Sequence, residues 1–180
     1  MDFISITHSL DEADTTDSLH SAIVNTPFSD KLRATELGLG IVVLLLCNKD
    51  DGTLDRIALS DTERAYQAVE ISAKPFHEIR IPSDYQKNIL IKSIDAKEPR
   101  FTQDWAHMFT PVLTDEEARF NQAGAGIACS AIYPLVPFGA TDAIGALIFS
   151  YFEPLQSLTN VHRDFMKLYA DTVVAKLVVN

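Results

Sequence analysis

The stretch IYPLVPFGATDAIGALIFSYF, residues 132–152, contains two apolar runs joined by a short loop. Both runs are rich in β-branched and aromatic residues, and the loop holds Pro, Gly and Asp, which is typical of two strands in a hairpin. Successive side chains of a strand point to opposite faces. In the second run the odd positions are larger than the even ones: Leu147, Phe149 and Tyr151 against Ala146, Ile148 and Ser150.

The preceding run has the same division. Its odd positions are Cys129, Ala131, Tyr133 and Leu135, and its even positions are Ala128, Ser130 and Ile132. We expect the bulky face to pack against the terminal helices. Ala and Ser alone cannot fill a layer to interior density. Either the connecting helices approach the small face closely, or a cavity for a small molecule remains there.

The other elements follow from turn and capping signals. Residues 40–48 and 53–60 predict two strands joined by the turn KDDG, and residues 75–82 and 100–105 predict short strands. Capping boxes predict helices beginning at Ser9, Ser60, Ser83 and Thr114. A short helix is expected over residues 29–37, with Gly38 as a left-handed cap, and a last helix from Thr159. This order predicts an α+β domain with an antiparallel sheet of about five to six strands.

Composition excludes several classes of protein. The chain has 180 residues and a formal net charge of −10, and it has no cluster of Lys and Arg, so we expect no nucleic-acid binding. The longest apolar run, 41–47, is too short to span a membrane. The first residues contain no secretory signal, which predicts a cytoplasmic protein. Cys47 and Cys129 lie in apolar runs without a second ligand at zinc-type spacing, so we expect reduced, buried thiols and no metal site.

The segment ACSAIYPLVPFGATDAIGALIFS resembles the hallmark of GAF domains, a family of small-molecule sensory domains. The matching positions are Ser130, Pro134, Leu135, Ile144, Gly145 and Leu147. The last helix is similar to the closing helix of that family, with Asp164, Phe165, Leu168 and Ala170 at the corresponding places. The resemblance extends from about residue 17 to residue 177. It implies a GAF domain over residues 17–180, with residues 1–16 as an N-terminal extension or the start of the first helix.

The resemblance implies a GAF/PAS-like fold, with the terminal helices on one face of the sheet and the connecting helices and a ligand pocket on the other. It also implies a sensory or regulatory domain in cytoplasmic signal transduction. Such a domain binds a small molecule or mediates dimerisation, and it passes a signal through its terminal helices to a fused or separate output domain. The sequence identifies no cofactor and no particular ligand.

The small face and the usual pocket of the family together predict a ligand-binding site. Its floor is expected to consist of four residues on the last two strands, Ser130, Ile132, Ile148 and Ser150. Tyr85, Trp105 and His107 are expected to supply its walls.

Specialised branches of the family fit the sequence poorly. The cyclic-nucleotide branch carries an Asn-Lys pair after the last strand, whereas here Asn48 and Lys49 lie in the first hairpin. The bilin branch needs a Cys followed by His, and Cys129 is followed by Ser. The enzymatic alternative is a free methionine sulfoxide reductase using Cys129, in the triplet Ile-Ala-Cys. Its partner cysteine is missing, and no basic residue lies near Cys129 in the sequence to favour a thiolate. We therefore expect no catalytic residue and no enzyme.

The last helix predicts a homodimer through the terminal helices. It carries two neighbouring apolar stripes, Val161, Phe165, Leu168, Thr172, Ala175 and Val179, and Met166, Tyr169, Val173 and Leu177. One stripe suffices to cover a sheet face. The surplus apolar surface either docks against the first helix or pairs with the same helix of another chain, and the sequence leaves both alternatives open.

Overall fold

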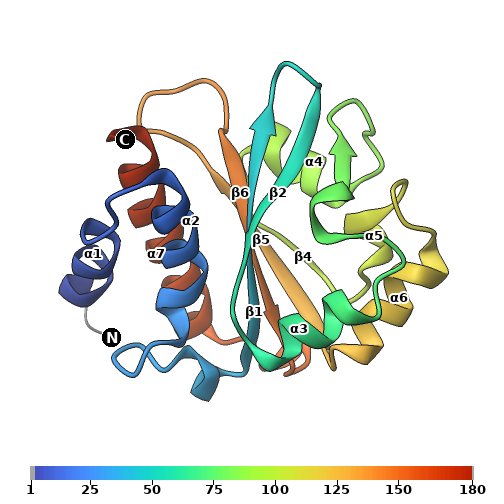
Figure 1. The fold of residues 1–180 in the computed structure, drawn as a ribbon, viewed down its shortest axis with the longest axis horizontal. Helices are drawn as coiled ribbons and strands as arrows, with labels where there is room; N and C mark the ends of the chain where they lie inside the picture. The colour runs from blue at the N-terminus through green and yellow to red at the C-terminus, as the bar shows by residue number, and fades with distance from the viewer. Residues whose placement is uncertain (1–2, 180) are drawn as a thin grey trace.

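A computed structural model describes residues 3–179 of the chain (Figure 1). The strands are β1 (Leu39–Asn48), β2 (Thr53–Leu59), β3 (Arg80–Pro82), β4 (Arg100–Thr102), β5 (Cys129–Leu135) and β6 (Gly145–Tyr151). The α-helices are α1 (Phe3–Asp11), α2 (Thr16–Asn25), α3 (Glu63–Glu70), α4 (Ile89–Ala96), α5 (Ala106–Phe109), α6 (Asp115–Gly124) and α7 (Asn160–Val179). Short 3-10 helices occupy Thr26–Phe28, Ala34–Leu37, Phe76–Glu78 and Leu155–Ser157.

All six strands form one antiparallel sheet in the order β3-β2-β1-β6-β5-β4. The predicted hairpins are β1–β2 and β5–β6, and the two hairpins join through the central pair β1–β6. The prediction of an α+β domain with five to six antiparallel strands is therefore confirmed.

The sheet separates two layers of helices. The terminal helices α1, α2 and α7 cover one face, and α3–α6 cover the other (Figure 1). The bulky odd positions lie against the terminal helices, as predicted. The ring centroid of Phe149 lies 6.1 Å from those of both Phe165 and Tyr169 on α7. The ring centroids of Tyr151 and His162 are 5.6 Å apart. The face opposite carries Ile132 among a second set of buried apolar residues.

Two predicted helix starts near the N-terminus are wrong. Ser9 lies inside α1, and the cap belongs to α2, where Thr15 and Ser18 form a reciprocal capping box. The expected helix over residues 29–37 is only a 3-10 turn over 34–37, because Arg33 has a left-handed backbone (φ +48°) that interrupts the helix. Gly38 is the left-handed cap (φ +78°), as predicted.

Two later helices begin further along the chain than their capping signals indicate. Ser60 is buried and accepts a hydrogen bond from the Val42 backbone N–H, so Thr62 caps α3 instead. Asn88, which the sequence pattern did not single out, caps α4 in place of Ser83. The capping box of Thr114 is confirmed at α6. The expected strand over 75–82 is a 3-10 turn followed by the three-residue β3.

Within residues 3–179, no helix combines the length and the apolar character that crossing a membrane requires.

Candidate functional site

The segment from α4 to α6 folds over the small face of β5 and β6 and positions Trp105. Gln122 on α6 holds this segment in place. Its Oε1 accepts a hydrogen bond from the Trp105 backbone N–H at 2.8 Å, and its Nε2 donates to the carbonyls of Gln103 and Ile127 at 3.0 and 3.2 Å. Gln122 is buried, so these bonds satisfy a side chain that would otherwise be costly to bury. Sequence reasoning missed this residue, since its partners lie on separate segments.

The four predicted floor residues lie together, and the indole of Trp105 covers one of them. Ser130 pairs with Ser150 across β5 and β6, and their hydroxyls are 2.8 Å apart. Trp105 Nε1 donates to Ser130 Oγ at 3.0 Å. Ile132 and Ile148 form the next pair along the same two strands. All four floor side chains are buried, so a ligand that reached the Ser130 hydroxyl would have to displace the indole.

The other two predicted wall residues, Tyr85 and His107, lie further out. They share a pocket of about 180 Å³ with Lys87 and Arg119. His107 is exposed, and its Nδ1 lies 3.0 Å from the Thr102 hydroxyl. The predicted site is thus divided into an inner group around Trp105 and an outer group around His107.

A larger pocket, of about 520 Å³, lies beside edge strand β4 and also includes His107. Lys87, Lys92 and Arg100 line it. The sequence contained a signal for these residues, because four bases, Lys97 among them, lie within the 14 residues 87–100 of an acidic chain. They were not predicted, because they lie on a loop, a helix and a strand that only the fold brings together.

Asp104 links the turn after β4 to α6. Arg119 donates to Asp104 Oδ2 from Nε and Nη2 at 3.0 and 2.7 Å. Partial burial favours the neutral carboxyl, but the hydrogen bonds from Arg119 and from the Ala106 backbone outweigh it, and the pKa of Asp104 is lowered. Arg119 is therefore paired within the protein.

Arg56 on β2 lies between two aromatic rings. Its guanidinium carbon is 4.1 Å from the ring centroid of Phe76 and 5.2 Å from that of Phe109. Burial lowers the pKa of Arg56 to about 9, and the guanidinium still carries its charge at neutral pH. The two rings stabilise this cation in place of a carboxylate.

Both cysteines are free thiols. Cys129 lies under the terminal helices, where its thiol contacts the Glu153 carbonyl oxygen at 3.3 Å, and burial raises its pKa to about 11. Burial also raises the pKa of the partly exposed Cys47. Among residues 3–179, no group of three His, Cys, Asp or Glu side chains is arranged to hold a metal ion.

Neither a protein-family model nor a curated protein matches the chain. Solved structures do. The GAF domain from a phosphoenolpyruvate-protein phosphotransferase (ptsP) of Coxiella burnetii matches with a TM-score of 0.65 and 14% identity, over 97% of this chain and 89% of that one. Residues 122 to 287 of a methyl-accepting chemotaxis protein match with a TM-score of 0.63 and 16% identity, over 97% and 95%.

A third similar structure is the reduced form of fRMsr of Staphylococcus aureus, with a TM-score of 0.58 and 10% identity over 97% of this chain and 93% of that one. The matching structures are mostly GAF domains, with TM-scores between 0.58 and 0.65. The chain therefore has the GAF fold, as its resemblance to that family predicts.

Proposed function

We propose that this chain is a sensory or regulatory GAF domain that pairs with a second copy of itself through α7. On this proposal the domain binds a small molecule on the α3–α6 side of the sheet. It passes the signal through its terminal helices to a fused or separate output domain in the cytoplasm. The observation that carries the proposal is the exposed apolar stripe of α7.

The inner face of α7 belongs to the core of the domain. Its buried side chains are Phe165, Met166, Tyr169, Ala170, Val173 and Val174. They lie against the bulky face of the sheet and against α1 and α2. Burial of this face is sufficient to attach α7 to the domain. The residues on the opposite side of the helix are not needed for that attachment.

An apolar stripe runs along the outer side of α7, flanked by exposed charged residues such as Asp164 and Asp171. Val161 and Leu168 expose 57% and 44% of their surface, and Ala175, seven residues further, is also exposed. Residues seven apart lie on one side of a helix, as at the seam of a coiled coil. The first helix contacts α7 elsewhere, through an ion pair between Asp11 and Lys176. Docking of α1 therefore leaves this stripe uncovered.

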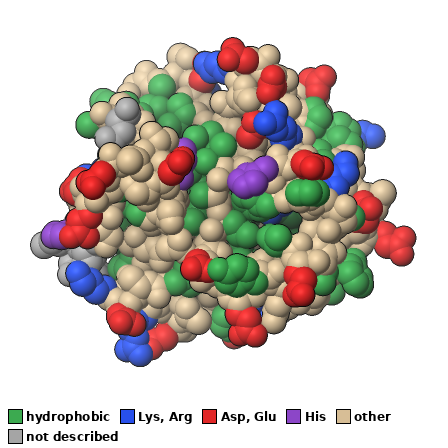
Figure 2. All heavy atoms as spheres, viewed as in Figure 1, with side chains coloured by type: hydrophobic (Ala, Val, Ile, Leu, Met, Phe, Trp, Pro, Cys, Tyr) green, Lys and Arg blue, Asp and Glu red, His purple; other side chains and the backbone are tan. Residues whose placement is uncertain are grey.

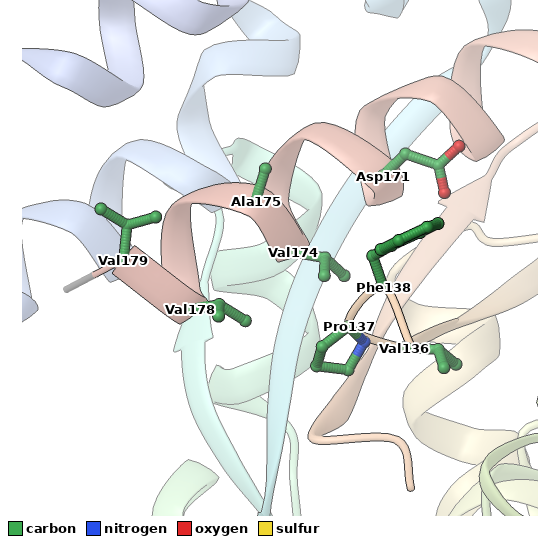
Figure 3. A pocket seen from close by; sticks show the side chains of 8 residues that line it. All are labelled: Val136, Pro137, Phe138, Asp171, Val174, Ala175, Val178 and Val179. Atoms are coloured by element: carbon green, nitrogen blue, oxygen red, sulfur yellow. The ribbon is translucent and has the colours of Figure 1, made fainter. Parts of the chain in front are cut away.

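The apolar surface continues at the C-terminal end of α7. A pocket of about 590 Å³ lies between this end and the β5–β6 loop (Figure 3). Its walls include Val174 and Val178 on the helix and Pro137 and Phe138 on the loop. Phe138 is fully exposed. A two-fold contact uses one such patch on both subunits, so a single apolar face suffices for a dimer.

Light scattering of the purified protein at high micromolar concentration tests the proposal. We expect a dimer mass for the natural chain. Leu168→Glu places a charge in the centre of the stripe and is expected to give a folded monomer. Phe120→Glu is the matched control, because Phe120 is 64% exposed and lies on α6, beyond the opposite face of the sheet. A monomer mass for the natural chain would overturn the dimer, and so would a dimer that survives Leu168→Glu.

The enzymatic alternative is disfavoured by the position of Cys129. A cysteine that acts as a nucleophile must ionise and must reach its substrate. Cys129 has no exposed surface, and burial raises its pKa instead of lowering it. We therefore propose a domain without catalytic activity of the methionine sulfoxide reductase type.

The ligand side of the proposal is supported by the two groups of residues around Trp105 and His107. The inner group combines buried serine hydroxyls with Ile132 and Ile148, and the Trp105 indole is hydrogen-bonded to Ser130. The outer group opens to solvent at His107. We propose that a small molecule contacts the polar side chains of these two groups.

A further inference from the structure

We infer that the larger pocket beside β4 binds the phosphate group of a small, soluble organic phosphate. This inference names the chemical class of the ligand and rests on the small-molecule part of the proposed function. The pocket, called the β4 pocket below, is lined by Lys87, Lys92, Arg100 and His107, with Phe101 as an apolar wall. Its volume of about 520 Å³ lies within the range of small-molecule sites.

The charge of the β4 pocket is opposite to that of the chain. The sequence has 25 acidic and 15 basic residues, and Figure 2 shows acidic side chains scattered over the face in view. Yet three bases and a histidine line this one pocket, and no acidic side chain lines it. A cationic site in an acidic protein selects anions locally, while the overall charge repels nucleic acids and anionic membranes. The occupant is therefore a small anion.

The three bases are also without internal partners. Among residues 3–179, some other basic side chains form ion pairs with carboxylates, namely Arg33, Arg80, Arg119, Lys167 and Lys176, and others, such as Lys31, form none. Within residues 3–179, Lys87, Lys92 and Arg100 form none. Like charges that share one pocket repel one another, and a bound anion converts this repulsion into attraction. A dianion such as a phosphate monoester gains most from several cations.

Arg100 supplies the most specific feature of the β4 pocket. It lies on β4 opposite Ile132, and its register places it on the side of the sheet that α4 covers. Its Nε is buried and has no hydrogen-bond acceptor among the described residues. Buried N–H groups nearly always have a partner. Arg100 as a whole is only partly buried, and its guanidinium fork matches two phosphate oxygens, so we expect a phosphate in the pocket to form charge-assisted bonds with its accessible N–H groups.

His107 and Phe101 indicate what accompanies the phosphate. His107 Nδ1 is engaged by the Thr102 hydroxyl, which orients the ring and leaves Nε2 available to a ligand. The ring of Phe101 meets Tyr133 edge to face and carries the Arg163 guanidinium 4.5 Å from its centroid, so it is a fixed apolar wall. A phosphate joined to a planar organic group uses both the cations and this wall. Inorganic phosphate uses only the cations.

Titration with phenyl phosphate at low ionic strength, followed by NMR of backbone amides and histidine rings, tests the inference. We expect the shifts to concentrate on residues 87–107, with a dissociation constant below about 1 mM. Inorganic phosphate is expected to bind more weakly at the same residues, and benzyl alcohol, which is neutral, is expected to cause no shift there. Shifts confined to other parts of the chain, or none up to about 10 mM phenyl phosphate, would overturn the inference.

Two charge-removing variants separate this site from a general effect of charge. Arg100→Gln and Lys92→Gln are each expected to weaken phenyl phosphate binding about tenfold. Lys31→Gln is the matched control, because Lys31 is exposed, forms no ion pair within residues 3–179 and does not line the β4 pocket. Equal weakening by Lys31→Gln would overturn the site. Arg100→Lys keeps the charge and is expected to retain part of the affinity. That result would show that the loss in Arg100→Gln comes from the missing charge and not from misfolding.

Light scattering on the same samples separates this inference from the dimer. A dimer that does not bind phenyl phosphate overturns the β4 pocket and leaves pairing through α7 intact. A monomer that binds it, with the expected effects of Arg100→Gln and Lys31→Gln, supports the β4 pocket and overturns only the pairing.

Discussion

Tyr151 and Tyr169 lie in the same core but differ in the partner of the phenol. Both side chains are fully buried, and burial raises the pKa of both hydroxyls far above the ordinary value. Tyr169 donates a hydrogen bond to the Ile23 carbonyl at 2.7 Å and so joins α7 to α2. The Tyr151 hydroxyl has no partner among residues 3–179. A buried hydroxyl stabilises the fold only if it is hydrogen-bonded.

This difference predicts opposite effects of the same substitution. Tyr169→Phe leaves the Ile23 carbonyl unsatisfied and is expected to lower the free energy of unfolding by about 1–2 kcal/mol. Tyr151→Phe removes an unpaired group and is expected to leave stability unchanged or to raise it by up to about 1 kcal/mol. Urea unfolding measures both effects. The slope of the free energy of unfolding against urea concentration should be the same in the variants and the natural chain, which is the control. A larger loss for Tyr151→Phe than for Tyr169→Phe would contradict the assignment.

At the scale of elements, the central pair of strands depends on Gly145. This residue begins β6 and pairs with Leu46 of β1 on one side and Leu135 of β5 on the other. A Cβ placed on Gly145 would lie 2.1 Å from the Leu45 carbonyl oxygen. Backbone cannot move aside as a flexible side chain can. The glycine in the Ile-Gly-x-Leu pattern is therefore required by the close approach of β1 to β6.

Gly145→Ala is expected to lower the free energy of unfolding by about 3 kcal/mol, because β1 and β6 join the two hairpins and must separate to admit the methyl group. Gly139→Ala in the β5–β6 loop is the matched control. Gly139 has a positive φ of +75° but nothing within 4 Å of its Cβ position, so only backbone strain of about 1 kcal/mol is expected. Thermal unfolding compares the two variants. Equal losses would contradict a requirement for glycine set by the contact with β1.

At the scale of the whole molecule, Cys129 reports on the opening of the terminal-helix layer. It lies on β5 with no exposed surface, in the same core as α1, α2 and α7. A thiol-labelling reagent can reach Cys129 only after this layer of helices separates from the sheet. In a Cys47→Ser background, which removes the partly exposed thiol, we expect the labelling rate of Cys129 to follow global unfolding. Rapid labelling of the native protein at pH 8 would contradict this expectation and would revive the enzymatic alternative.

The raised pKa of Cys129 also sets the sign of a pH effect. The unfolded thiol ionises near pH 9, whereas the folded thiol holds its proton to about pH 11. The contribution of this group to stability is therefore fully present below pH 9 and is lost as the pH rises toward 11. Cys129→Ala should remove this part of the alkaline loss, which unfolding at several pH values measures.

Local sequence determined the sheet and its two faces. The alternation of large and small residues in 132–152 assigned the bulky face to the terminal helices, because side chains of a strand alternate whatever surrounds them. Short-range signals were equally dependable where their partners lie within a few residues, as at the Thr114 capping box and at Gly38. They failed where a distant group binds the expected capping residue. The Val42 backbone N–H donates to the Ser60 hydroxyl, and Thr62 caps α3 instead.

Only the tertiary structure decided how the site is assembled. Trp105 and Ser130 are 25 residues apart, and their hydrogen bond exists because α6 holds one segment over the other. The cations of the β4 pocket come from a loop, a helix and an edge strand, and no periodicity relates them. Alternation and capping are properties of neighbouring residues, which the backbone itself imposes. Convergence of charges depends on long-range packing, and that information is spread over the whole chain.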